Sequence, residues 1–301
     1  MHRKTLTRAI PSNHKRLSAM LSRLRSTWQT IKYWPHYLWA SYRFSGYKPQ
    51  PVTVASVTKW LNQFDDKDRK IILQLMKKVS YISEKETETW LLRLNNSLLE
   101  RLSAVNIPIK NIIYVQIHDP GSSSAVILNM LRDRGRLERK GCYFIDSKNV
   151  RELHEVTESL EQGAIVYVDD FAATGRQFCQ VRDYLAEYIV GNFSEFFLLP
   201  SICEEALYEL GRRGVEAVAE KLHSKAERPL HQNSSILAKA TKNRLIELCQ
   251  MIDKKGALGY RGLATMVVFY RNAPNTTPVI LRGCVRQRPF VGIFPRATDL
   301  P

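Results

Sequence analysis

The sequence predicts an α/β fold in which helices flank a parallel β-sheet, and two observations carry this prediction. Between residues 106 and 219, short apolar segments alternate with segments of helical periodicity, as in a parallel sheet with right-handed crossovers. Within this region, the apolar run Ala164–Val168 is rich in β-branched residues and short enough for a strand buried on both faces. We expect strands at residues 111–117, 143–145, 164–168, 193–199 and 215–219, and helices at 125–134, 150–160 and 178–190.

Four regions are expected along the chain. Residues 1–53 form a basic, aromatic-rich N-terminal arm, 54–105 a layer of three helices against the sheet, 106–219 the sheet domain, and 220–301 a C-terminal segment. In the last of these we expect a helix at 236–252 and a strand at 263–270. Ser83-x-x-Glu86 and Ser201-x-x-Glu204 both match the capping box that begins a helix.

The net charge of +16 is spread unevenly. Residues 1–64 hold eleven Lys or Arg and no Asp or Glu, and rings such as Trp28 and Trp34 are interleaved with them. A helix is expected from about Lys15 to Lys32, broken or bounded by Pro35. Two interpretations of residues 1–50 are open: the rings pack on the protein or a partner, or the arm binds nucleic acid or a nucleoprotein by stacking and phosphate contacts.

Three further expectations concern the arm, the compartment and the membrane. Residues 48–54 read as an extended linker, so we expect a chain starting near Pro51 to fold without the arm. The five cysteines are scattered, odd in number and without a CxxC pair, which favours a reducing cytoplasm over disulfides or a zinc site. No run approaches 18 apolar residues, so no membrane span is predicted.

The stretch GAIVYVDDFAATGRQ, Gly163–Gln177, organises the chain. A predicted strand ends in Asp169 and Asp170, a small-residue turn follows, and a helix begins. This order describes a ligand site at the carboxyl end of a parallel strand. The turn can direct backbone N–H groups and the Thr174 hydroxyl at a phosphate, and two carboxylates can accept hydrogen bonds from vicinal ribose hydroxyls. The alternative is a buried strand that ends in a solvated acidic turn.

A second loop has a similar setting, between the first predicted strand and the helix at 125–134. Its residues are Asp119, Gly121, Ser122, Ser123 and Ser124. A Gly/Ser loop before a helix N-terminus is an anion-binding arrangement. The serines are equally suited to cap the helix, so both interpretations are open.

The acidic pair, three residues and then Thr-Gly resemble the ribose-5-phosphate signature of the type I phosphoribosyltransferases. In that family the motif holds the ribose and 5′-phosphate of phosphoribosyl pyrophosphate, usually with Mg²⁺. The resemblance implies that Asp169 and Asp170 are catalytic and hold the ribose, and that the loop 119–124 holds pyrophosphate with magnesium. It assigns the 5′-phosphate to Phe171, Ala172, Ala173, Thr174, Gly175, Arg176 and Gln177. The family has a small residue and then Thr or Ser after Thr-Gly, so Arg176 and Gln177 depart from its pattern and Arg176 is a candidate extra phosphate anchor.

The C-terminal segment is similar to a narrower group, the phosphoribosyltransferase-like proteins of bacterial conflict systems. The similarity lies in Leu-Gly-Tyr at 258–260, Asn-x-Pro-Asn-x-x-Pro at 272–278 and Phe-Pro-Arg at 294–296, and with Trp60 and Phe64 it covers roughly residues 54–296. It implies that residues 220–301 include a hood over the base. It also implies an anti-phage effector, associated with retrons, with a winged-helix or reverse-transcriptase partner.

Two functions of different classes follow. The first is a phosphoribosyltransferase-like enzyme that acts on a nucleotide or on phosphoribosyl pyrophosphate with Mg²⁺. The second is a non-catalytic nucleotide-sensing or nucleic-acid-binding regulatory protein that retains the ribose-phosphate site, because a fold does not fix a function. Turnover of a nucleotide or of phosphoribosyl pyrophosphate distinguishes them.

Overall fold

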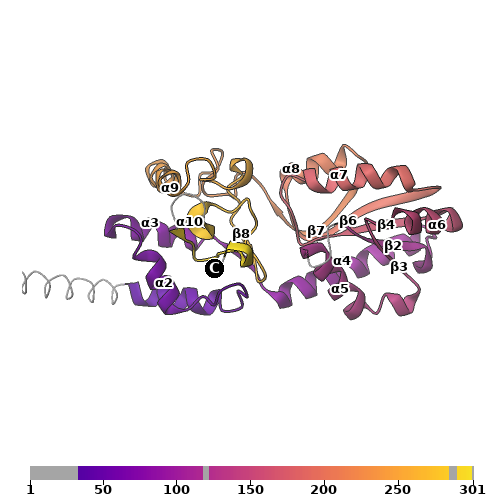
Figure 1. Cartoon of the computed structure of the whole chain (residues 1–301), viewed down its shortest axis with the longest axis horizontal. Coiled ribbons are helices and arrows are strands. Elements are labelled where there is room, and N and C mark those ends of the chain that lie inside the picture. The colour runs from indigo at the N-terminus through magenta and orange to yellow at the C-terminus, as the bar shows by residue number, and fades with distance from the viewer. Residues whose placement is uncertain (1–32, 118–121, 285–289, 300–301) are drawn as a thin grey trace, which may run out of the picture.

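The structure, a computed structural model, describes residues 33–117, 122–284 and 290–299. It has two lobes that lie side by side (Figure 1). One lobe contains a parallel sheet between two layers of helices. The other combines segments from near the two ends of the chain. None of the described helices is long and apolar enough to span a membrane.

The sheet lobe confirms the α/β prediction, with a strand at each of the five expected places. Its strands, in the order in which they lie side by side, are β3 (Tyr143–Asp146), β2 (Ile112–Gln116), β4 (Gln162–Val168), β6 (Asn192–Cys203) and β7 (Glu216–His223). All neighbouring pairs are parallel. A short strand, β5 (Phe171–Ala172), pairs with β6 beyond the end of β4. The line of β4 is therefore interrupted by two residues, Asp169 and Asp170, and then resumes.

Helices cover both faces of this sheet. The helices are α4 (Glu84–Ala104) and α5 (Ser123–Gly135) on one face, and α6 (Val150–Leu160), α7 (Arg176–Leu185) and α8 (Glu204–Gly211) on the other. Alternate residues of a strand point to the two layers of helices. Val166 of β4 packs with α4 and α5, whereas Ile165 and Tyr167 pack with α6, α7 and α8. Burial on both faces explains why these strands are continuous apolar runs in the sequence.

The second lobe joins segments that are far apart in the sequence. Its elements are a helix at residues 33–43, α2 (Val54–Leu61), α3 (Asp66–Met76), β1 (Ser80–Ile82), α9 (Lys239–Ile252), β8 (Val267–Phe269) and α10 (Val279–Arg282). Strands β1 and β8 pair in parallel, and one apolar core is shared by residues 37–81 and 230–294. The expected layer 54–105 is thus divided, because α2 and α3 lie in this lobe and only α4 covers the sheet. The sheet itself extends past residue 219, to His223.

Part of the N-terminal arm belongs to the core of the second lobe. The Phe44 ring lies 4.9 Å from the Phe294 ring, edge to face, and the Tyr47 hydroxyl donates a hydrogen bond to the carbonyl of Pro295 at 2.6 Å. This packing does not fit the expectation that a chain starting near Pro51 folds alone. Pro35 lies within the helical residues 33–43, so it does not break the helix there. Trp28 and the helix expected at residues 15–32 lie outside the described residues.

The two predicted capping boxes have different outcomes. Ser83 and Glu86 form the reciprocal hydrogen bonds of a capping box at the start of α4, as predicted. Ser201 does not cap α8, because β6 continues through it and Cys203 occupies the N-cap position. Its hydroxyl lies instead 2.6 Å from Nε2 of His223.

Truncation of Phe44 tests whether the arm stabilises the fold. Phe44 is fully buried against Tyr81 and Phe294. We expect Phe44→Ala to lower the free energy of unfolding by about 3–5 kcal/mol, the usual result of emptying a buried aromatic site. Tyr42 on the same helix is 86% exposed, so Tyr42→Ala should change it by less than about 0.5 kcal/mol. Urea denaturation followed by circular dichroism measures both, and equal effects would contradict a packed arm.

Candidate functional site

The acidic pair lies at the carboxyl edge of the sheet, in the break between β4 and β5. Asp169 is buried, and its Oδ1 accepts hydrogen bonds from the Ser123 hydroxyl at 2.8 Å and from the backbone N–H of Asp170 at 2.9 Å. The Ser124 hydroxyl donates to the carbonyl of Val168 at 2.7 Å. The structure therefore brings together two groups of residues that the sequence predicted separately, the acidic pair and the start of α5. The carboxylates are not the solvated turn that the alternative interpretation described.

The serines before α5 also have structural roles. Ser122 is the N-cap of α5 and accepts a hydrogen bond from the N–H of Ala125 at 3.4 Å. The Ser124 hydroxyl accepts one from the N–H of Ile117 at 3.1 Å. The capping interpretation is therefore correct for Ser122, and a pyrophosphate contact of this loop stays a prediction. Asp119 and Gly121 lie outside the described residues.

Burial raises the pKa of Asp170. Asp170 is partly buried, and its pKa is raised from 3.8 to about 8, first by burial and second by the adjacent Asp169 carboxylate. The Ser123 hydroxyl and the Arg271 guanidinium act in the opposite direction and do not overcome these two causes. Arg271 follows β8 in the second lobe, so both lobes contribute charge to the site. Arg271 comes directly after a predicted strand but was not among the predicted site residues.

The turn after the pair is shaped by Gly175. Its φ of +67° lies in the left-handed region that favours glycine, and a Cβ there would approach within 3.3 Å of Cα of Ala206 on α8. Gly175 is also the N-cap of α7, which receives no side-chain cap and has no acidic residue in its first turn. The Thr174 hydroxyl accepts a long hydrogen bond, 3.4 Å, from the N–H of Arg176. A helix N-terminus with an exposed Arg176 beside it is favourable for an anion.

The other residues that were predicted to bind the 5′-phosphate differ in burial and in their contacts. Phe171 lies between the lobes: its ring is 6.0 Å from the Phe269 ring and 6.3 Å from the His223 ring. Ala172 is buried where β5 pairs with β6, whereas Gln177 is exposed on the first turn of α7. Ala173 is partly buried in the turn. Through Phe171, the segment that contains the acidic pair contacts the second lobe.

A buried Ser–His pair lies beside Phe171 and was not anticipated. Ser201 and His223 are on the adjacent strands β6 and β7, near their carboxyl ends. Burial lowers the pKa of His223 to about 4, so the imidazole is neutral at pH 7. The His223 carbonyl accepts a hydrogen bond from Arg228, which is itself buried and paired with Glu205. The predicted strands end at residues 199 and 219, before Ser201 and His223, so this pair had no direct signal in the sequence.

Comparison with known proteins places the chain in a family. The family model PRTase-CE matches residues 57–296, which is most of the chain. The chain belongs to the PRTase-CE family. The resemblance to phosphoribosyltransferase-like proteins is thereby confirmed at the level of the family, and the acidic pair lies inside the matched region of this PRTase-CE protein. No curated protein matches the sequence.

Two solved structures show a distant likeness to this PRTase-CE member. Orotate phosphoribosyltransferase from Aeropyrum pernix is 20% identical over 42% of this chain and 67% of its own, with a TM-score of 0.29. A hypothetical protein from Neisseria gonorrhoeae with bound ppGpp is 13% identical over 56% of this chain and 97% of its own, with a TM-score of 0.28. Scores of this size carry no argument about function.

The raised pKa of Asp170 predicts a pH dependence of stability. Between pH 3.8 and about 8 the folded protein retains a proton that the unfolded chain has lost. The free energy of unfolding should therefore fall as the pH rises through this window and become level above it. In Asp170→Asn this contribution is absent, so the variant should gain stability relative to the wild type as the pH increases from 5 to 8. Urea denaturation at several pH values measures this difference in the free energy of unfolding. Asp65→Asn, at an exposed position, is the control. Parallel curves for wild type and Asp170→Asn would contradict the assignment.

Proposed function

We propose that the acidic pair and the turn after it bind the ribose 5-phosphate part of a nucleotide or of phosphoribosyl pyrophosphate, and that the protein is a phosphoribosyltransferase-like enzyme. One observation carries the proposal. Asp169 and Asp170 lie between strands β4 and β5, at the carboxyl edge of a parallel sheet. A glycine turn and the N-terminus of α7 follow them directly. Membership of the PRTase-CE family supports it.

Each group at the site has a role in this proposal. Asp169, oriented by the Ser123 hydroxyl, accepts hydrogen bonds from the ribose hydroxyls. Thr174, Gly175 and the first turn of α7 bind the 5′-phosphate. Positive charge that develops on the sugar ring during transfer is stabilised by the nearby carboxylates, so positioning and electrostatics supply the catalysis. Arg271 brings a positive charge from the second lobe to the leaving group.

Magnesium is proposed to enter with the substrate. Mg²⁺ takes oxygen ligands and is usually bound by one or two carboxylates together with substrate phosphates. Asp169 and Asp170 are ligands of this type. Within residues 33–117, 122–284 and 290–299, no group of three or more His, Cys, Asp or Glu could hold a metal by itself. The substrate phosphates would therefore complete the coordination.

Binding and turnover test the proposal in sequence. Calorimetry with phosphoribosyl pyrophosphate and Mg²⁺ should show binding that Asp169→Asn with Asp170→Asn abolishes. Thr174→Ala should weaken it by about 1–3 kcal/mol, the usual effect of losing a hydrogen bond to a charged group. Asp65→Asn, exposed on the second lobe, is the control and should bind as the wild type does. Gly175→Val is unsuitable, because its strain against α8 would disturb the fold without any ligand.

Release of base or pyrophosphate then separates the enzyme from the regulatory alternative. Purified protein is incubated with a panel of nucleotides, bases, NAD and phosphoribosyl pyrophosphate, and the products are followed by chromatography. We expect turnover that the double Asp variant lacks. Binding without turnover of any of these compounds would favour a sensor that retains the site.

The biological role that we propose is that of a cytoplasmic anti-phage effector associated with a retron or a related conflict system, with a winged-helix or reverse-transcriptase partner. The resemblance of residues 54–296 to conflict-system proteins supports it. Cells that express the chain with its genomic neighbours should resist phage. The double Asp variant should lose this resistance while the protein remains present. Resistance that survives the double variant would contradict an effector role of the acidic pair.

A nucleic-acid or nucleoprotein contact through residues 1–50 is a second candidate function. Of the described residues there, Trp34, Leu38 and Tyr42 lie four apart on one helical face and are 46%, 48% and 86% exposed. The sequence of residues 1–50 interleaves aromatic rings with Lys and Arg, and this combination suits stacking on bases together with phosphate contacts. Gel shifts with RNA and single-stranded DNA should show binding that falls steeply with salt and that Trp34→Ala with Tyr42→Ala weakens. An affinity for nucleic acid that does not change with salt concentration would contradict this function.

A further inference from the structure

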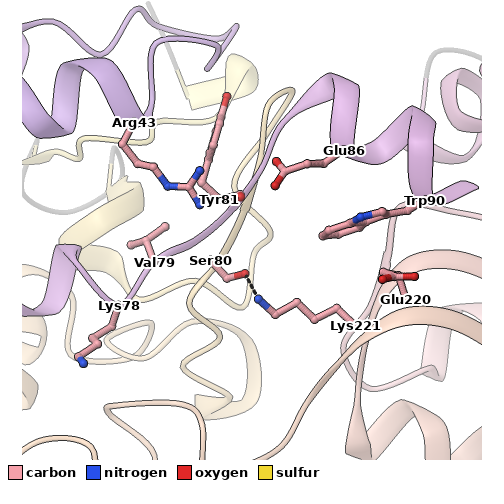
Figure 2. A pocket seen from close by; sticks show the side chains of 9 residues that line it. All are labelled: Arg43, Lys78, Val79, Ser80, Tyr81, Glu86, Trp90, Glu220 and Lys221. Carbon is pink, nitrogen blue, oxygen red and sulfur yellow. Dashed lines mark hydrogen bonds between the residues drawn. The ribbon is translucent and has the colours of Figure 1, made fainter.

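A cavity of about 410 Å³ lies where the two lobes meet. Its volume is within the range of small-molecule sites. The second lobe contributes the helix at 33–43 and β1, and the sheet lobe contributes α4 and β7 (Figure 2). The lining residues are Arg43, Lys78, Val79, Ser80, Tyr81, Glu86, Trp90, Glu220 and Lys221. None of the residues assigned above to the ribose-phosphate site is among them.

The side chains that line this cavity carry a net positive charge, because three cations, Arg43, Lys78 and Lys221, stand against two carboxylates. Of its two carboxylates, Glu220 is ion-paired with Arg93, whereas Glu86 accepts hydrogen bonds from Ser83 in the capping box of α4 and keeps its negative charge. Its cations have no such partners, since in the described part of the chain neither Arg43, Lys78 nor Lys221 forms an ion pair. Lys221 donates to the neutral Ser80 hydroxyl at 2.9 Å, and Arg43 contacts the carbonyl and ring of Tyr81. The net positive charge and these three cations favour an anion as the ligand.

One wall of the cavity is aromatic. The Trp90 indole projects from α4 into the space toward which Arg43 and Lys221 extend from opposite lobes (Figure 2). Trp90 is partly buried, so part of its ring is available for contact. An indole beside cations suits a ligand that carries both a planar ring and a phosphate, because the ring can stack while the phosphate meets the charges.

We propose that this cavity is a second ligand site, specific for an organic phosphate with a planar ring and of mononucleotide size. The phosphate contacts Arg43 and Lys221, and the ring packs on Trp90. The proposal does not depend on the function of the acidic pair. The two sites are nevertheless neighbours, since Trp90 and Phe171 pack on the same cluster of Ile82, Val267 and Phe269. A ligand that contacts both lobes here stabilises one arrangement of the lobes around the acidic pair.

Calorimetry with AMP as the probe tests the site in the full-length protein. We expect Lys221→Gln to raise the Kd for AMP at least about tenfold, the effect of losing a charge-assisted hydrogen bond. Trp90→Leu should raise it by about tenfold through lost stacking, whereas Trp90→Phe, which keeps a ring, should restore most of the affinity. Lys59→Gln, an exposed lysine on α2, is the matched control and should bind as the wild type does.

Two further experiments test whether AMP binds in this cavity. The variant Asp169→Asn with Asp170→Asn should retain AMP affinity at the cavity, because those residues do not line it. Inorganic phosphate should compete with AMP, and its own affinity should fall in Lys221→Gln but not in Trp90→Leu. Circular dichroism confirms that each variant is folded. Absence of AMP binding to the folded wild type, AMP binding that only the double Asp variant removes, or equal affinity in Lys221→Gln would each overturn the proposal.

Discussion

The parallel pairing of β1 with β8 is the constraint on which the arrangement of both sites depends. Three residues of each strand are in register, Ser80–Ile82 with Val267–Phe269, and backbone hydrogen bonds continue the pairing on either side, from Ser80 to Met266 and from Tyr270 to Ile82. This short ladder joins chain segments almost two hundred residues apart. Arg271 directly follows it and acts on Asp170, while Ser80 and Tyr81 line the cavity.

The acidic pair shows which electrostatic effect prevails at the carboxyl edge of the sheet. Burial and the neighbouring Asp169 carboxylate raise the pKa of Asp170, and a hydroxyl and a guanidinium only partly offset them. A fold gains little stability from placing a partly buried carboxylate, Asp170, next to a buried one, Asp169. Such an arrangement is therefore evidence for a site that is completed by a ligand with donors or positive charge. A magnesium-bound sugar phosphate has both.

The sheet was predictable from the sequence because each strand is a continuous apolar run, and burial on both faces gives that pattern without any knowledge of tertiary contacts. Helix α6 was predicted to the residue. Elements of the second lobe were predicted, such as α2, α3 and α9, but their assembly into one lobe was not, because its core depends on contacts such as Phe44 with Phe294 that no local pattern records. Strand β1 has only three residues, too few for a periodic signal. The Ser201 capping box failed because the strand before it was longer than its apolar part suggested.

The candidate site, like the fold, was predictable only where its residues are close together in the sequence. Asp169, Asp170 and the glycine turn are consecutive in the chain, so their chemistry is visible as a motif. Ser201 with His223, and Arg271 with Asp170, come together only through strand pairing and lobe packing. The part of the candidate site that one strand and one helix supply was therefore predictable, whereas the part that depends on the pairing of strands and lobes was not.

The division into two lobes also bears on how the acidic pair could be controlled. The sheet lobe alone supplies Asp169 and the turn before α7, but the positive charge of Arg271 is supplied by the second lobe. The apolar contact beside the pair is small: Trp90 and Phe171 pack against Ile82, Val267 and Phe269. The cavity next to this contact is polar and lined from both lobes. Any ligand with different affinities for two lobe arrangements would change the charge balance at the pair, and binding at the pair would change the affinity for that ligand by the same factor.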